Sequence, residues 1–121
     1  MEKIRRYEDL DVYRMAYQAA LDMHRLTLKF PSVEQFELAR QIRKSSKSIC
    51  ANLAEGFGKQ SQSKPEFKRF LSMAIGSADE TKVWLDFAKD LGYLTKENHE
   101  RFKETYTIIA KMLSGLHRNW G

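Results

Sequence analysis

The sequence has little of the residues that interrupt helices or cross-link small folds. Its 121 residues include one cysteine, two prolines and six glycines. With Cys50 alone, no intrachain disulfide can form, and we expect a cytoplasmic protein in a reducing compartment. So few prolines and glycines argue against a turn-rich β fold. The length fits one domain, residues 1–121, that is large enough to bury a core.

Long apolar runs are missing as well. No stretch reaches the roughly 18 apolar residues of a membrane span, so we expect no membrane partner. The charged start, with Glu2, Lys3, Arg5 and Arg6, does not resemble a signal peptide. Hydrophobic residues make up 42% of the chain and charged residues 31%, which is the composition of a folded protein rather than a disordered one.

Turn-forming residues divide the chain into four segments that are too long for strands. Ser32, Ser63 and Thr95 can each cap a helix after a turn, and Asp9 or Asp11 can cap the first helix. The expected helices cover residues 9–29, 32–56, 63–91 and 95–117. Short connections make neighbouring helices antiparallel, which predicts an all-α, antiparallel up-down four-helix bundle.

Each segment carries an apolar stripe with residues three and four positions apart, as expected for a helix that faces a bundle core. The stripes include Val12, Ala16, Ala19 and Met23 in the first segment, Ile42, Ser46, Ile49 and Leu53 in the second, Phe67, Leu71, Ala74 and Ala78 in the third, and Phe102, Tyr106, Ile109 and Leu113 in the fourth.

The first and third segments have a second stripe opposite the first. A helix that is apolar on two sides in so small a protein packs against another chain, so we predict a homo-oligomer. The alternative is a semi-exposed surface. Gly76 favours a close helix approach, because a glycine inside a helix costs about 1 kcal/mol relative to alanine. The predicted interface consists of Leu10, Tyr17, Leu21, Leu28, Arg69, Met73, Gly76, Glu80, Val83 and Phe87.

Positive charge is concentrated between Arg40 and Arg69. This stretch holds eight basic residues and two acidic ones, Glu55 and Glu66, so its net positive charge exceeds the +5 of the whole chain. Such a cluster is typical of a surface that binds the phosphate backbone of RNA or DNA. The alternative is a solvated helix face. The candidate nucleic-acid-binding residues are Arg40, Arg43, Lys44, Lys47, Lys59, Lys64 and Lys68.

No arrangement typical of catalysis or metal binding is visible. His24, His99 and His117 lie on different expected helices and lack zinc-ligand spacing. Cys50 lies among apolar and small residues, where a buried thiol is the simplest interpretation. We therefore expect a protein that is not an enzyme and that needs neither a cofactor nor a metal.

Several motifs together resemble a known family. They are the opening residues 7–13, residues 30–31, 34, 38 and 41–42, the segment Ser48-Ile49-Cys50-Ala51-Asn52-Leu53-Ala54-Glu55-Gly56, and residues 70–71, 74–77, 80 and 91–93. In this order the chain resembles the bacterial four-helix-bundle proteins encoded in intervening sequences of 23S rRNA genes. The resemblance covers residues 7–94, and the pattern Ser-Ile-x-x-Asn-Leu-Ala-Glu-Gly is its most specific part.

The resemblance implies a small bacterial protein that forms a homopentameric ring and has a role with RNA or another nucleic acid. A related accessory protein of diversity-generating retroelements has a similar architecture and acts beside a reverse transcriptase. The resemblance also singles out a set of polar and small residues, which we expect where helices or chains approach closely, or else in a binding pocket. Besides Gly76 and Glu80, the set consists of Gln41, Ser48, Asn52, Glu55, Gly56 and Ser77.

Two functions therefore remain open from the sequence. The first is an oligomer that binds nucleic acid through its basic surface. The second is a structural or adaptor oligomer whose partner is another protein. A membrane-surface module is disfavoured, because neither two-sided helix has a wholly basic polar face.

Overall fold

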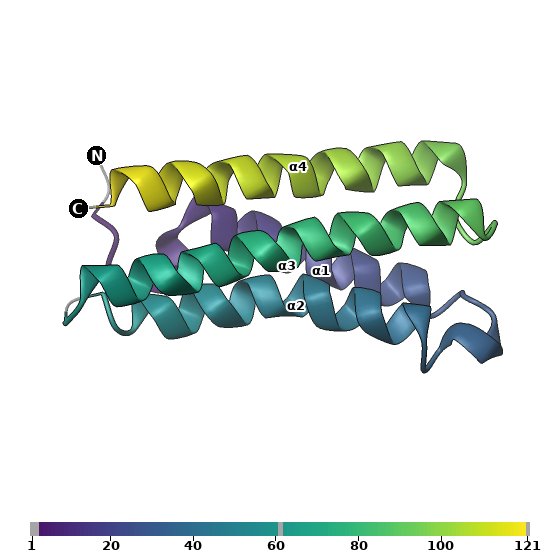
Figure 1. Ribbon diagram of the computed structural model, residues 1–121, viewed down its shortest axis with the longest axis horizontal. Coiled ribbons are helices and arrows are strands. Elements are labelled where there is room, and N and C mark those ends of the chain that lie inside the picture. Colours follow the sequence, from purple (N-terminus) through teal and green to yellow (C-terminus); the bar gives the residue numbers. More distant parts are fainter. Residues whose placement is uncertain (1–2, 61, 121) are drawn as a thin grey trace.

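The computed structural model describes residues 3–60 and 62–120, which form four α-helices and two short 3-10 helices (Figure 1). In chain order, the elements are η1 (Tyr7–Asp9), α1 (Asp11–Thr27), η2 (Ser32–Glu34), α2 (Leu38–Phe57), α3 (Lys64–Asp90) and α4 (Lys96–Asn119).

The helices run alternately up and down, and each one packs against the next in sequence, with α1 closing the bundle against α4 (Figure 1). This arrangement confirms the predicted all-α up-down four-helix bundle.

The predicted caps of α3 and α4 are confirmed. Ser63 Oγ accepts the backbone N–H of Glu66 at 3.2 Å, and Thr95 Oγ1 accepts the backbone N–H of Asn98 at 3.0 Å. Each bond satisfies a backbone donor that the first helical turn leaves unpaired. Gly92 ends α3 with φ of 84°, a left-handed conformation that favours glycine and lets the helix stop sharply.

The predicted starts of the first two helices are wrong. Asp9 does not cap α1; its Oδ2 accepts the backbone N–H groups of Arg5 and Arg6 at 3.0 Å and so fixes the turn before it. Ser32 begins only the short η2, and α2 starts six residues later, at Leu38.

The connection between α1 and α2 is held by side chains instead. Gln35 Nε2 donates to the carbonyls of Thr27 and Phe30, both at 2.9 Å. The Arg43 guanidinium donates to Thr27 Oγ1 at 3.1 Å and to the Gln35 carbonyl at 2.7 Å. These bonds satisfy the carbonyls at the end of α1, and they explain why the chain does not continue directly into a helix at Ser32.

The predicted core stripes are buried as expected, including all of Phe67, Leu71, Ala74 and Ala78 on α3. Helices α2 and α3 approach closely at Gly56, where an added Cβ would lie 2.5 Å from Phe70 Cβ. Along the same seam, Ser48 and Ser77 share a 2.6 Å hydrogen bond and Thr81 Oγ1 donates to Ser45 Oγ at 2.8 Å. Small residues therefore set the spacing of these two helices.

Candidate nucleic-acid interface

Three of the predicted cations share one exposed side of α2. Arg40, Lys44 and Lys47 lie within two helical turns and are exposed, and we call this set the basic face. Among the described residues, none of the three forms an ion pair with a carboxylate, whereas Arg69 pairs with Glu66 at 2.7 Å. The basic face is therefore free to receive an external anion.

The positive charge of Lys47 acts on a neighbouring histidine, His24. Lys47 Nζ lies 2.9 Å from His24 Nδ1, and because an ammonium has only donors, the imidazole nitrogen must accept. The Lys47 charge, with smaller effects from partial burial, Arg43 and Arg25, lowers the pKa of His24. The same charges, Lys47, Arg43 and Arg25, make this part of the surface electropositive.

Arg40 also has an aromatic neighbour. Its guanidinium carbon lies 5.1 Å from the centroid of the Phe36 ring, and Phe36 is 73% exposed. A guanidinium held over a ring keeps its donor edge available for phosphate.

The other four predicted nucleic-acid-binding residues do not join this face. The guanidinium of Arg43 is engaged in the α1–α2 connection described above. Lys59 lies in the turn after α2, close enough to Glu66 to help Arg69 lower the pKa of Glu66. Lys64 begins α3 at that same end of the bundle. The cluster expected as one continuous surface is therefore divided.

Lys68 lies on α3 rather than on α2. It lies two turns before Ile75, which faces α4 across a surface groove of about 490 Å3. This groove carries three cations that the sequence analysis did not select, because they come from different helices: Lys82, Lys111 and Arg118. Its only acidic lining residue, Asp79, pairs with Lys82 at 3.3 Å.

The predicted oligomer interface is largely exposed in the monomer. On α3, Met73, Val83 and Phe87 are 44%, 48% and 53% exposed, and Arg69, Gly76 and Glu80 are exposed beside them. An added Cβ at Gly76 would meet no atom within 4 Å, so nothing in the monomer explains this helical glycine. We call these six residues the α3 face.

The corresponding stripe on α1 needs one correction. Leu10 is only 5% exposed and belongs to the monomer core, because it precedes α1 and turns inward under the N-terminal segment. Tyr17 and Leu28 are exposed, and Leu21 is half-buried against α2.

The polar residues singled out by the resemblance follow the α2–α3 seam. Asn52 Nδ2 donates to the Ser48 carbonyl at 2.9 Å and to Ser48 Oγ at 3.2 Å, which extends the Ser48–Ser77 contact. Gln41 and Glu55 are exposed at its outer edge, and Glu80 accepts a 3.2 Å bond from Trp84 Nε1. Ser48, Asn52, Gly56 and Ser77 thus join the two helices within one chain.

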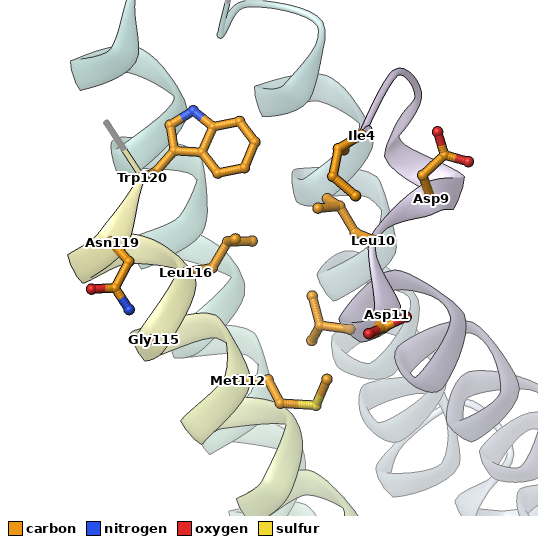
Figure 2. Close-up of a pocket in the computed structure, with 10 residues that line it drawn as sticks. Ile4, Asp9, Leu10, Asp11, Met112, Gly115, Leu116, Asn119 and Trp120 are labelled. Atoms are coloured by element: carbon orange, nitrogen blue, oxygen red, sulfur yellow. The ribbon is translucent and has the colours of Figure 1, made fainter. Parts of the chain in front are cut away.

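One cavity lies at the end of the bundle where the first described residues meet the end of α4 (Figure 2). It measures about 340 Å3 and is lined mainly by apolar side chains, among them Ile4, Leu116 and Trp120. The two carboxylates at its rim are engaged, Asp9 with backbone N–H groups and Asp11 with Arg14. Its lining therefore offers hydrophobic contact rather than acid–base chemistry.

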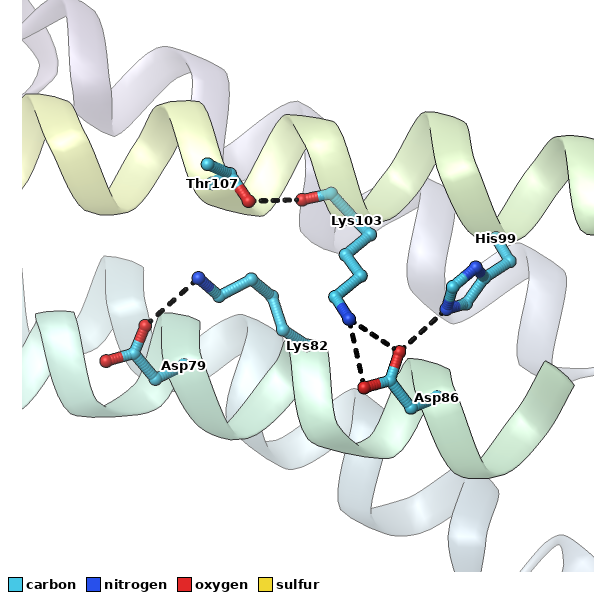
Figure 3. Close-up of polar contacts among 6 residues, drawn as sticks. All are labelled: Asp79, Lys82, Asp86, His99, Lys103 and Thr107. Carbon is cyan, nitrogen blue, oxygen red and sulfur yellow. Dashed lines mark hydrogen bonds and ion pairs between the residues drawn. The ribbon is translucent and has the colours of Figure 1, made fainter. Parts of the chain in front are cut away.

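A second polar cluster joins α3 to α4 (Figure 3). Lys103 Nζ donates to both oxygens of Asp86 at 2.9 and 3.0 Å, and His99 Nε2 lies 2.7 Å from Asp86 Oδ1. The hydrogen bonds from Lys103, aided by His99, lower the pKa of Asp86 against the opposing effect of burial. The cluster is a link between two helices, and the sequence analysis missed it because its members are 13 and 17 residues apart.

Neither the cysteine nor the histidine and carboxylate side chains form an arrangement typical of a nucleophile or a metal site in the part of the chain that the structure describes. Burial raises the pKa of the Cys50 thiol to about 11, so it is almost entirely protonated at neutral pH and reacts slowly as a nucleophile. Within residues 3–60 and 62–120, no three His, Cys, Asp or Glu side chains gather as a metal site would require. In that same part of the chain, no helix has the length and apolar character to cross a membrane.

Comparisons with known proteins agree with the geometry. A solved structure of a protein of unknown function, from the S23 ribosomal protein family of Bacteroides thetaiotaomicron, superimposes with a TM-score of 0.80 at 28% sequence identity. The alignment covers 89% of this chain and 96% of that chain. Among curated proteins, no sequence matches.

The family comparison covers a similar share of the chain. The model of the 23S rRNA-intervening sequence proteins matches residues 8–115, which include all four helices except the last residues of α4. This match covers the basic face, the α2–α3 seam and the α3 face together. The chain therefore belongs to the family of 23S rRNA-intervening sequence proteins.

Proposed function

We propose that this protein is a non-enzymatic homo-oligomer that binds RNA or DNA through the basic face of α2. The observation that carries the proposal is the set of three exposed cations, Arg40, Lys44 and Lys47, none of which has a carboxylate partner among the described residues. Elsewhere, cations such as Arg14 and Lys103 pair with carboxylates. Free cations on one helix side suit a ligand with regularly spaced negative charges.

The local field supports the same ligand. The charges of Lys47, Arg43 and Arg25 lower the pKa of His24, and nearby phosphate groups would offset this local excess of positive charge. Lysine and arginine contacts of this kind fix a nucleic acid by its backbone and carry no sequence information. We therefore expect binding with slight sequence preference and strong salt dependence.

The α3 face supports self-association. It is a ridge of exposed apolar side chains around Gly76, and the monomer gives no packing reason for that glycine. A ring requires two different patches on each subunit. A second apolar group, Leu28, Val33 and Phe36, lies exposed at the α1–α2 connection and supplies one. A ring of five would repeat the basic face five times and raise avidity for a long polyanion.

The adaptor function has an observation of its own. Val33 and Phe36 are 74% and 73% exposed, more than any other large hydrophobic side chain in the described residues. If these two side chains bind another protein rather than a second copy of this chain, the oligomer acts as an adaptor. An example would be a role beside a reverse transcriptase, as in the related accessory protein of diversity-generating retroelements.

A charge reversal of the basic face tests the nucleic-acid function. Arg40, Lys44 and Lys47 are replaced together by Glu, and binding to a labelled RNA is measured by fluorescence anisotropy over a range of salt concentrations. The variant should bind at least tenfold more weakly at low salt. The slope of log affinity against log salt should fall by about 2–3, because each lost phosphate contact removes about 0.7–0.9.

A matched variant controls for net charge. Lys89, Lys96 and Lys111 are exposed and lie outside the basic face, so their replacement by Glu changes the total charge equally. This control should keep most of the affinity and slope. Equal loss in both triple variants, or no binding by the wild type at low salt, would contradict the proposal and leave the adaptor function.

A further inference from the structure

A small groove between α1 and α2 brings an aromatic pair next to the basic face. It has a volume of about 230 Å3, and its lining consists of Tyr13, Tyr17, Ala20, Leu21, Lys47 and Cys50. We call it the tyrosine groove. Its volume is below the range of about 300–1,000 Å3 that is usual for drug-sized ligands, so it suits a single flat ring.

The two tyrosines form an ordered platform. The rings of Tyr13 and Tyr17 are stacked, with centroids 6.0 Å apart and an angle of 30° between their planes. Tyr7 supports Tyr13 edge-on, with centroids 4.9 Å apart. Tyr17 is still 51% exposed, so an aromatic surface is available beside rings that are already fixed. Binding there would require little additional ordering of side chains.

The positive charge of Lys47 favours a nucleotide over a second copy of the chain as the molecule bound in the tyrosine groove. Lys47 is part of the lining and contacts His24, so a cation sits at one wall of an otherwise apolar hollow. A second copy covering the groove with apolar side chains would bury this ammonium without a counter-charge, which is costly. A nucleotide offers a flat ring for the tyrosines and a phosphate for the lysine.

We propose that the tyrosine groove receives a base of single-stranded nucleic acid, which stacks on Tyr17 while the adjoining phosphate contacts Lys47. The strand then continues along α2, where Lys44 and Arg40 contact further phosphates. This inference rests on the proposed nucleic-acid function and specifies it, because a base inside a duplex could not reach Tyr17. It also reassigns Tyr17 from the oligomer interface predicted by the sequence.

The test compares Tyr17→Ala with Tyr17→Phe, using an oligouridylate and an RNA duplex of equal length as probes. Stacking contributes about 1–3 kcal/mol per base, so Tyr17→Ala should bind the oligouridylate about 5- to 150-fold more weakly. Tyr17→Phe keeps the ring and should bind like the wild type. The salt slope and the duplex affinity should be unchanged in both variants, because the phosphate contacts remain.

Cys50 provides an independent readout, since it is the chain's single cysteine and lies in the groove lining. Its alkylation by a maleimide at mildly alkaline pH should slow when the wild type is saturated with oligouridylate and should be unaffected by duplex. Equal protection by the duplex would show that no base enters the groove.

The outcomes separate this inference from the proposed function. If Tyr17→Ala binds oligouridylate as the wild type does, while the triple Glu variant of the basic face does not, the stacking inference is wrong and the nucleic-acid function stands. If Tyr17→Ala instead lowers the molecular mass in light scattering, Tyr17 belongs to an interface between copies. If the wild type binds neither probe at low salt, both proposals fail.

Discussion

At the scale of single residues, the helical glycines Gly56 and Gly76 have opposite surroundings. A Cβ at Gly56 would lie 2.5 Å from Phe70 Cβ and 3.1 Å from Phe67 Cδ1, so any side chain there would push α2 away from α3. At Gly76 the space is open. Gly56 is therefore a packing requirement of the monomer, whereas the monomer does not require Gly76.

Gly56→Ala should destabilise the fold. Because the Phe70 Cβ cannot swing away without moving its helix, we expect a loss of about 1–3 kcal/mol in the free energy of unfolding, measured by urea denaturation. Gly115→Ala is the matched control, because a Cβ there meets only the end of the flexible Arg118 side chain, at 3.9 Å. It should be neutral or stabilise by up to about 1 kcal/mol. Equal stabilities for Gly56→Ala and the wild type would show that α2 and α3 can separate at little cost.

The roles of these glycines were only partly predictable. Gly56 was predicted to lie where helices or chains approach closely, and it does so between α2 and α3 of one chain. A close approach was also predicted at Gly76, but no contact in the monomer supplies it. Helical periodicity shows which residues share a side of a helix, but it does not give the distance to the neighbouring helix.

At the scale of elements, Asp86, Lys103 and His99 join α3 to α4 near the end where these helices connect (Figure 3). The pKa of Asp86 is lowered in the folded chain, so its ionised form stabilises the fold. This contribution is present above the ordinary aspartate pKa of about 3.9 and disappears as the pH falls through the lowered value.

Replacing Lys103 should therefore have a pH-dependent effect. Asp86 and Lys103 are both more than a third exposed, so Lys103→Met should cost about 0.2–1 kcal/mol of unfolding free energy at pH 7. The difference from the wild type should shrink as the pH is lowered below about 4. Urea denaturation at several pH values measures it, with Lys111→Met, an exposed position on the same helix, as the control. A difference that persists unchanged at low pH would mean that Lys103 acts through packing of its stem rather than through Asp86.

Element boundaries were predictable where local capping determines them. Ser63 and Thr95 cap α3 and α4 through bonds to backbone three residues away, which a sequence pattern can show. The start of α2 depends instead on Arg43, which holds Thr27 across sixteen residues, and local patterns do not contain such a contact. The same reason explains why the link from Asp86 to Lys103 was missed.

At the scale of the whole molecule, the bundle separates charges that the sequence places close together. Lys68 is 21 positions after Lys47 but lies on α3, whereas Lys47 lies on the side of α2 next to α1, where it contacts His24. Three cations that are distant in the sequence, Lys82, Lys111 and Arg118, line one groove between α3 and α4 instead. The distribution of charge along the sequence therefore does not show which basic side chains lie on the same surface of the fold.

The monomer leaves the apolar side chains of the α3 face exposed, and a substitution at Val83 tests whether this face mediates self-association. Val83→Lys places a charge in the middle of the α3 face, where a neighbouring copy would have to bury it without a partner. The molecular mass from light scattering at micromolar concentration should then fall toward the 14.2 kDa monomer. Helical content should be unchanged, because the side chain is 48% exposed in the monomer.

Ile108→Lys is the matched control for this change. Ile108 is an apolar residue of α4 that is 38% exposed, and it lies on a helix outside the α3 face. This variant should keep the mass of the wild type, since it introduces the same charge at a position that no proposed contact uses. A wild type that is already monomeric would remove the basis for a ring. A mass lowered equally by both variants would show that added charge, rather than the α3 face, controls assembly, and the contact between subunits would then have to be sought on another side of the bundle.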